Sequence, residues 1–189
     1  MFSNIAQDDS YLKGRALEAR ARRENSPEGW LDFASLKAGK GSYAPAAMGF
    51  LNAGTLLEAA GNSAAAAGAY QSGFSVCVKG KLKEAALLIV SRLAALAERG
   101  SDFSAAVSAY EKLGAFFEAQ KAFFLAADAY EHAAEMLFSG GDDISAYRKP
   151  AELWLLNAQY WAKSGNSGDE AWSRRRAELY LELVKKGKK

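Results

Sequence analysis

The side chains that could carry chemistry are few, and the single histidine is the first of them. His132 stands between Glu131 and Glu135 in a segment with helical periodicity, where it could act as a general base or a metal ligand. Either role needs further ligands or partners, and the chain has only one histidine and one cysteine. The favoured interpretation is a solvated or half-buried helix residue, with Glu131 and Glu135 as an exposed pair one helical turn apart.

Three other groups of residues have a structural explanation as well as a chemical one. Cys77 lies in an apolar stretch and is interpreted as a small core residue rather than a nucleophile. The run 39–42 reads Gly-Lys-Gly-Ser but lacks the spacing of a phosphate loop and follows a helix, so an interhelical turn is expected. Asp142 and Asp143 are acids at a helix N-terminus. The sequence therefore predicts a protein that is not an enzyme, without metal, cofactor or small-molecule substrate.

The composition predicts that helices position all of these residues. The 189 residues include 39 Ala but only five Val, three Ile and one Thr. Alanine is the best helix former, whereas β-branched residues favour strands. An all-α fold follows, and the length suits one domain with an extension.

Regular breaks divide the chain into helices. Glycine followed by Ser, Asn or Asp is typical of one helix ending and the next beginning, and Pro27 after Ser26 suits the first position of a helix. Short loops between such helices place neighbours antiparallel. The expected helices span residues 11–24, 27–39, 43–60, 63–79, 81–99, 103–114, 116–139, 144–163 and 168–187.

Two stretches of the chain share a pattern of bulky, small and glycine residues. It resembles the tetratricopeptide repeat, in which a helical hairpin recurs, and the second copy starts 73 residues after the first. The resemblance implies a right-handed superhelix of about four antiparallel hairpins with an N-terminal flanking helix: a flanking segment 1–25, a repeat domain 26–187 and a basic tail 188–189. The two copies contain Trp30, Phe33, Ala34, Gly41, Tyr43, Ala46, Phe50 and Ala53, and Phe103, Tyr110, Gly114, Phe116, Ala119, Phe123 and Ala126.

A second resemblance concerns residues 126–135, Ala-Ala-Asp-Ala-Tyr-Glu-His-Ala-Ala-Glu. This run is similar to the soluble NSF attachment proteins (SNAP), which are helical stacks that recruit a disassembly ATPase to membrane-fusion complexes. The resemblance implies the same type of fold and, as an alternative function, an adaptor at such complexes.

The tetratricopeptide resemblance also implies a binding groove. In that family the first helix of each hairpin lines a concave face that holds a peptide or helix of another protein. For Tyr70 and Phe74, ordinary packing between helices is an equally weighted explanation. The groove positions carried over to this sequence are Leu31, Asp32, Ser35, Tyr70, Gln71, Phe74, Ser108, Glu111, Leu155 and Gln159.

Charge is nearly balanced overall but unevenly distributed. The formal net charge is +2, from 24 basic and 22 acidic residues, which disfavours a dedicated nucleic-acid binder. Residues 100–145 hold eight acids against two lysines, while both ends are basic. Self-association of basic ends with the acidic middle and peripheral contact with an acidic membrane are alternatives to simple solvation. The basic surface at the C-terminal end comprises Arg174, Arg175, Arg176, Lys185 and Lys186.

The expected location is the cytoplasm. The N-terminal residues lack the basic and apolar regions of a signal peptide, and the longest apolar run, 85–90, is far shorter than the about 20 residues of a membrane span. The sequence thus predicts a cytoplasmic scaffold or adaptor that binds another protein in a groove.

Overall fold

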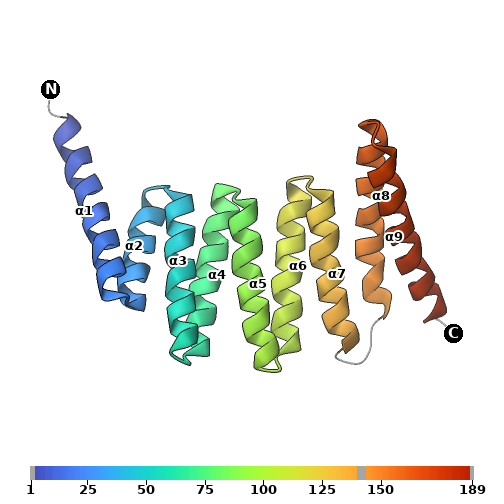
Figure 1. The fold of residues 1–189 in the computed structure, drawn as a ribbon, viewed down its shortest axis with the longest axis horizontal. Coiled ribbons are helices and arrows are strands. Elements are labelled where there is room, and N and C mark those ends of the chain that lie inside the picture. Colours follow the sequence, from blue (N-terminus) through green and yellow to red (C-terminus); the bar gives the residue numbers. More distant parts are fainter. Residues whose placement is uncertain (1–2, 140–143, 188–189) are drawn as a thin grey trace. The chain divides into compact units, whose positions relative to one another are not determined.

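A computed structural model describes residues 3–139 and 144–187, with side chains described for residues 12–138 and 144–187. Within these residues the chain forms nine α-helices and one short 3₁₀ helix, and no strand (Figure 1). The elements are α1 (Ser3–Glu24), α2 (Pro27–Gly39), α3 (Tyr43–Ala59), α4 (Ser63–Gly80), α5 (Lys83–Arg99), α6 (Phe103–Ala119), α7 (Phe123–Ser139), η1 (Ile144–Tyr147), α8 (Arg148–Lys163) and α9 (Ser167–Lys186).

The turns between α2 and α7 repeat with a fixed period. Positive φ angles occur at Gly41, Gly61, Lys81, Ser101 and Lys121, one every 20 residues. At each turn the next residue donates its backbone N–H to the carbonyl five positions earlier, at 2.9–3.0 Å, which closes the preceding helix. The left-handed conformation suits glycine best, yet three of the five positions are not glycine. The period is therefore set by the hydrogen-bonded turn and not by glycine alone.

A buried alanine follows each of these turns at the same distance. Its lack of a long side chain lets adjacent helices approach closely. The alanines lie in the first turn of their helices and are fully buried: Ala46, Ala66, Ala86, Ala106 and Ala126.

The helices form two compact units, residues 1–96 and 97–189, with the division inside the last turn of α5. In the first unit, α1 packs on α2, α2 on α3 and α3 on α4. One cluster of its core joins α1 to α4, with Leu17, Leu31, Leu56 and Leu57 packed against it. The buried members of that cluster are Ala21, Trp30, Phe33, Ala53 and Ala69.

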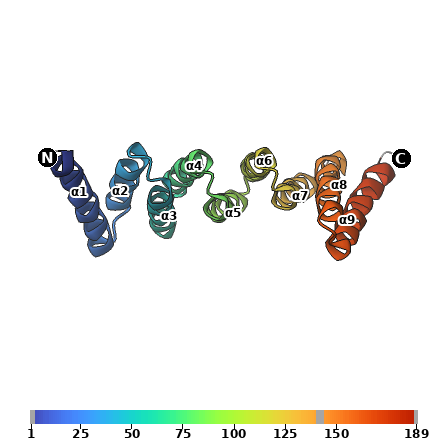
Figure 2. The same ribbon diagram turned by 90° about the horizontal axis from the view of Figure 1, so that it is seen from above.

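The second unit contains α6 to α9. Here α6 packs on α7, α7 on α8 and α8 on α9, and η1 contacts all of the last three helices. Figure 2 shows α8 and α9 side by side, as these contacts require. Trp154 of α8 is the largest of the fully buried side chains. The described part of the chain includes no helix that is both long and apolar enough to cross a membrane.

The all-α fold predicted from composition is confirmed, but one pair of helices is divided differently. Residues 103–114 and 116–139 were the expected helices, whereas α6 continues to Ala119 and the turn falls at 120–122. Gly114 is therefore an interior residue of α6. In addition, α1 begins at Ser3 and not at residue 11. Asp142, Asp143 and the tail 188–189 lie outside the described residues.

The spacing of 73 residues between the two tetratricopeptide-like copies does not match the observed repeat. Trp30 is the fourth residue of α2, while Phe103 is the first residue of α6, so the two copies were aligned out of register. Two successive helices and their turns occupy 40 residues, against 34 in the tetratricopeptide repeat. The coarser conclusion stands: this is a repeat of helices packed on their neighbours.

Candidate functional site

The site is built on the contact between α6 and α7, where a glycine meets a tyrosine. A Cβ atom on Gly114 would lie 2.6 Å from Cε2 of Tyr130, so only glycine fits beneath this ring. On its other side, Nζ of Lys149 lies 5.4 Å from the centre of the Tyr130 ring, a cation–π distance. The ring is therefore held between α6 and the first turn of α8.

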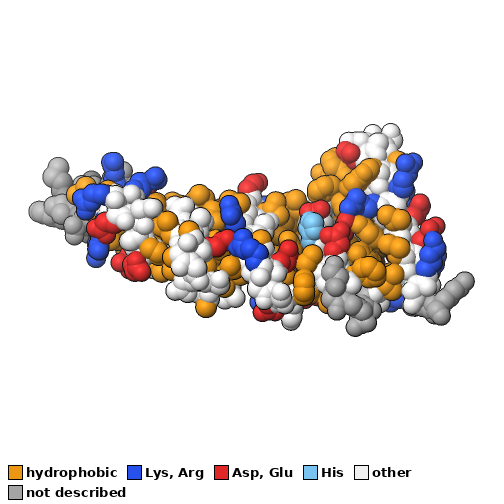
Figure 3. Space-filling view, turned by 60° about the horizontal axis from the view of Figure 1, so that its bottom comes forward, with side chains coloured by type: hydrophobic (Ala, Val, Ile, Leu, Met, Phe, Trp, Pro, Cys, Tyr) orange, Lys and Arg blue, Asp and Glu red, His pale blue; other side chains and the backbone are white. Residues whose placement is uncertain are grey.

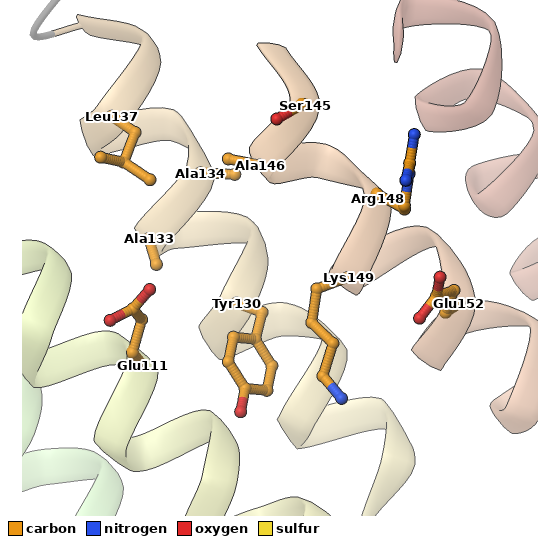
Figure 4. A pocket seen from close by; sticks show the side chains of 10 residues that line it. All are labelled: Glu111, Tyr130, Ala133, Ala134, Leu137, Ser145, Ala146, Arg148, Lys149 and Glu152. Carbon is orange, nitrogen blue, oxygen red and sulfur yellow. The ribbon is translucent and has the colours of Figure 1, made fainter. Parts of the chain in front are cut away.

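A pocket opens beside Tyr130 because the chain departs from its 20-residue period after α7. The next α-helix begins only at Arg148, after η1. The space between α6, α7, η1 and α8 has a volume of about 390 Å³ (Figure 4). The residues that line it are Glu111, Tyr130, Ala133, Ala134, Leu137, Ser145, Ala146, Arg148, Lys149 and Glu152.

The floor of the pocket is apolar and its rim is charged. Ala133 and Ala134 are almost fully buried, whereas 37% of Leu137 is exposed. Figure 4 shows the Glu111 carboxylate, from α6, on the side of the pocket where Ala133 lies. Glu111, Arg148 and Glu152 are exposed. A partner's apolar side chain would thus find an apolar floor between charges.

Lys149 is already engaged by the protein itself. Its Nζ donates a hydrogen bond to Glu118 Oε1 at 2.9 Å, and this bond raises the pKa of Lys149 above its ordinary value. Burial raises the pKa of Tyr130, with the carboxylates of Glu118 and Glu111 acting in the same direction. Lys149 therefore stays charged and fixed to Glu118, and it is not a free base for chemistry.

Next to the pocket, Glu131 forms a buried polar cluster with α8 and α9. Its carboxylate accepts hydrogen bonds from Trp154 Nε1 at 3.1 Å and Arg176 Nε at 3.0 Å, and it forms a second, shorter contact with Arg176 Nη2. Burial and the hydrogen bond to Glu131 raise the pKa of Tyr180. Only 4% of Glu131 is exposed, so the expectation of an exposed Glu131–Glu135 pair is wrong for Glu131.

Arg176 also corrects the predicted basic surface. Its guanidinium lies 5.6, 5.4 and 5.8 Å from the ring centres of Trp154, Trp172 and Tyr180, and it pairs with Glu131, so it holds α9 to α7. The prediction that Arg176 belongs to a free basic surface is wrong, because a buried carboxylate fixes it. Of the remaining members, Arg174 pairs with Glu170 along α9 at 2.9 Å, and Arg175, Lys185 and Lys186 are exposed.

His132 lies on the opposite side of α7 from this cluster's carboxylate, as an exposed helix residue. Its Nδ1 is 3.1 Å from Glu135 Oε2, its Nε2 is 4.0 Å from Asp128 Oδ2, and its ring is 5.2 Å from that of Tyr110. Burial raises the pKa of Asp128, and the charge of His132 opposes that shift. Among the described residues, no group of three or more metal-ligating side chains comes together.

Cys77 and the 39–42 run are placed as the structural interpretations predicted. Cys77 is fully buried, and burial raises the pKa of its thiol to about 11, so it is a neutral core residue near neutral pH. Residues 40–42 form the turn between α2 and α3, with φ of 70° at Gly41.

The predicted groove residues fall on α2 and α4 in the first unit, and on α6 and α8 in the second. Tyr70 is fully buried between α3 and α4, where its hydroxyl donates to Glu58 at 2.7 Å, so the prediction that it contacts a partner is wrong. Leu31 packs on the core cluster. Phe74, Ser108 and Leu155 are half-buried, and the exposed members are Asp32, Ser35, Gln71, Glu111 and Gln159.

Only Glu111 of these predicted groove residues lines the pocket. The other lining residues were missed because they lie on α7 and at the η1–α8 junction, not on the first helices of hairpins to which the resemblance pointed. The usable signal was the longer interval, with a second proline at Pro150, between the turn at 120–122 and the next regular helix.

The described fold and pocket define an all-α helical-repeat protein. No protein-family model matches the chain, and no curated protein matches it. Among solved structures it is similar to the one titled "Crystal structure of BtubC (BKLC) from P. vanneervenii", with 12% sequence identity over 94% of this chain and 90% of that chain and a TM-score of 0.31. A TM-score this low carries no argument about fold or function.

Proposed function

We propose that this protein is a non-enzymatic interaction scaffold of tetratricopeptide-like helical hairpins that holds a peptide or helix of another protein. The observation that carries this function is the pocket between α6, α7 and the start of α8, with its floor of Ala133, Ala134 and Leu137. Apolar pockets with a few charged groups at the rim are how helical proteins hold the anchoring side chains of partners.

The surface of the second unit supports the same function. Figure 3 shows hydrophobic side chains gathered around the pale-blue His132. Monomeric proteins expose scattered apolar side chains, whereas a concentration of large ones is typical of interaction sites. Large exposed apolar side chains on α7, α8 and α9 include Phe124, Leu137, Phe138, Leu156, Tyr160, Trp172 and Leu179.

Support against catalysis comes from how the titratable groups are used. Lys149 is bound to Glu118, Cys77 is buried with a raised pKa, and His132 lies among acids on an exposed helix face. The proposed function therefore includes no cofactor. A cytoplasmic location is part of it, supported by the free thiol, which suits a reducing compartment.

The experiment compares capture of partners by three forms of the protein. Wild type, Leu137→Ser and Leu87→Ser are used as baits in a native lysate, and bound proteins are identified by mass spectrometry. Leu87 is the matched control, because it is 38% exposed against 37% for Leu137 and lies on α5, outside the pocket.

We expect a partner that wild type and Leu87→Ser retain and Leu137→Ser loses, with all three forms equally helical by circular dichroism. Equal recovery on all three baits would contradict this function for the pocket.

A further inference from the structure

The pocket exists because the second unit leaves unfilled a space that the first unit fills. Ala133 stands 60 residues after Gly73, and both follow their tyrosine, Tyr130 or Tyr70, by three positions. A Cβ on Gly73 would lie 3.0 Å from Ile89 Cδ1, so α5 packs directly on α4 at this point. In the second unit η1 is interposed before α8, and Ala133 lines open space instead.

The charges around this space are mostly acidic once internal pairs are accounted for. Lys149 is neutralised by Glu118. Among the described residues no ion pair joins Glu111, Glu152 or Arg148 to another side chain, which leaves two carboxylates against one guanidinium. On the adjoining face of α6 and α7, the carboxylates of Glu98, Glu135 and Asp128 raise the pKa of Tyr110, in addition to its burial.

The lining also indicates the backbone form of the occupant. An extended peptide needs partners for its own N–H and C=O groups. The uncharged polar groups that line the pocket are the hydroxyls of Tyr130 and Ser145. An α-helix satisfies its backbone internally and presents apolar and basic side chains one turn apart, so it suits an apolar floor beside acidic groups.

We propose, building on the interaction function above, that the pocket binds an amphipathic basic helix of a separate partner protein. An apolar side chain of that helix enters over Ala133, Ala134 and Leu137, and a Lys or Arg one turn away pairs with Glu111. The apolar contact supplies most of the affinity, and the acidic rim selects basic helices over acidic ones.

The test uses two fluorescently labelled helical peptides of the same apolar pattern, one built from Leu and Lys and the other from Leu and Glu. Their binding to the full chain is followed by anisotropy at low and high salt. We expect the Leu/Lys peptide to bind and to weaken as salt increases, because salt screens exposed charges. The Leu/Glu peptide should bind at least about tenfold more weakly.

Variants locate the binding. Leu137→Ser should abolish Leu/Lys peptide binding while Leu87→Ser leaves it unchanged. Glu111→Lys should weaken it about fivefold, which is the size expected for one exposed ion pair. Asp32→Lys makes the same charge change on exposed α2 in the first unit and should weaken it much less.

Equal binding of both peptides, or no effect of Leu137→Ser, would overturn the inference. A dimer seen by sedimentation without peptide and abolished by Leu137→Ser would also overturn it, because a second copy would then be the occupant. If Leu137→Ser loses a lysate partner but the peptides show no charge preference, the basic helix is wrong and the proposed function stands. If Leu137→Ser affects neither, both are wrong.

Discussion

The α3–α4 and α6–α7 pairs use the same three residues at the same spacing, yet they end in different surroundings. Gly54, Glu58 and Tyr70 in the first pair stand 60 positions before Gly114, Glu118 and Tyr130 in the second. In both, the tyrosine ring covers the glycine so closely that a Cβ would lie 2.6 Å from a ring carbon. The helix contact is therefore the same.

The difference lies in what the glutamate binds and what covers the tyrosine. Glu58 accepts the Tyr70 hydroxyl at 2.7 Å, and Tyr70 is fully buried. Glu118 instead accepts Lys149 of α8, and Tyr130 remains half-buried beside the pocket. The first pair is closed into a core, whereas the second leaves room for a ligand. One contact between helices thus serves a structural and a binding role, depending on the third helix.

The largest expected effect concerns how that third layer is held in the second unit. Arg176→Ala would leave the buried carboxylate of Glu131 without its ion pair, which costs about 3 kcal/mol or more. We expect the fluorescence of Trp154 and Trp172 to report early unfolding in urea. In contrast, alkylation of Cys77, in the first unit, should reach its fast phase at the wild-type urea concentration.

The double variant Glu131→Leu/Arg176→Met is the control for that change. Replacing both charges with apolar groups should recover most of the lost stability. A double variant as unstable as Arg176→Ala alone would show that the aromatic packing around Arg176, not its charge, holds α9.

The second prediction separates the two Gly–Tyr contacts directly. Gly54→Ala forces a methyl group against the fully buried Tyr70 and should cost about 3 kcal/mol, within the range for overpacked cores. Gly114→Ala should cost about half as much, because Tyr130 can shift toward the pocket. Urea unfolding followed by circular dichroism measures both.

Gly68→Ala is the control for helix propensity. It also replaces a glycine within a helix, but nothing lies within 4 Å of the new Cβ. It should stabilise the protein by about 0.5–1 kcal/mol. Equal losses for Gly54→Ala and Gly114→Ala would contradict the view that the pocket relieves the second contact.

A third, smaller difference is expected when each tyrosine loses its hydroxyl. Tyr70→Phe removes the hydrogen bond to Glu58 and should cost about 1 kcal/mol. Tyr130→Phe should cost less than about 0.5 kcal/mol, because Glu118 is held by Lys149 instead. Both values come from the same urea titration, and a larger loss for Tyr130→Phe would reverse the comparison.

The smallest effect is a pH dependence from Asp128. Burial raises the pKa of Asp128 in the folded protein, so the folded state holds this proton more tightly than the unfolded state does. Its contribution to stability is present below the ordinary carboxyl pKa and is lost as the pH rises through the folded pKa. Asp128→Asn should therefore raise the melting temperature by about 2 °C at pH 7, and this gain should shrink toward pH 3.5.

The matched control is Asp32→Asn, which changes an exposed aspartate of the first unit and should leave the melting temperature unchanged at pH 7. A gain for Asp128→Asn that persists at pH 3.5 would contradict the assignment to ionisation.

Local features of the sequence predicted most of the fold but little of the candidate site. The helix ends at 24, 39 and 99 and the starts at 27, 43, 63 and 103 follow from nearby turn and capping residues, such as Asn62, whose side chain accepts from the backbone N–H of Ala65. The site was predicted from a family pattern, which included Glu111 and missed Tyr130 and Leu137. Burial of Tyr70 could not be read from its type, because tyrosine suits both an interface and a groove.

By itself the sequence determined the helices, because alanine content, caps and turns act over a few residues. The tertiary structure alone decided whether a given polar or small residue is buried. Gly114 reads as a helix end until Tyr130 is placed against it, and Glu131 reads as exposed until Trp154 and Arg176, 23 and 45 residues away, donate to it. Burial is a property of what packs from elsewhere in the chain, and for that reason the pocket and its charge appear only once α6, α7 and α8 are assembled.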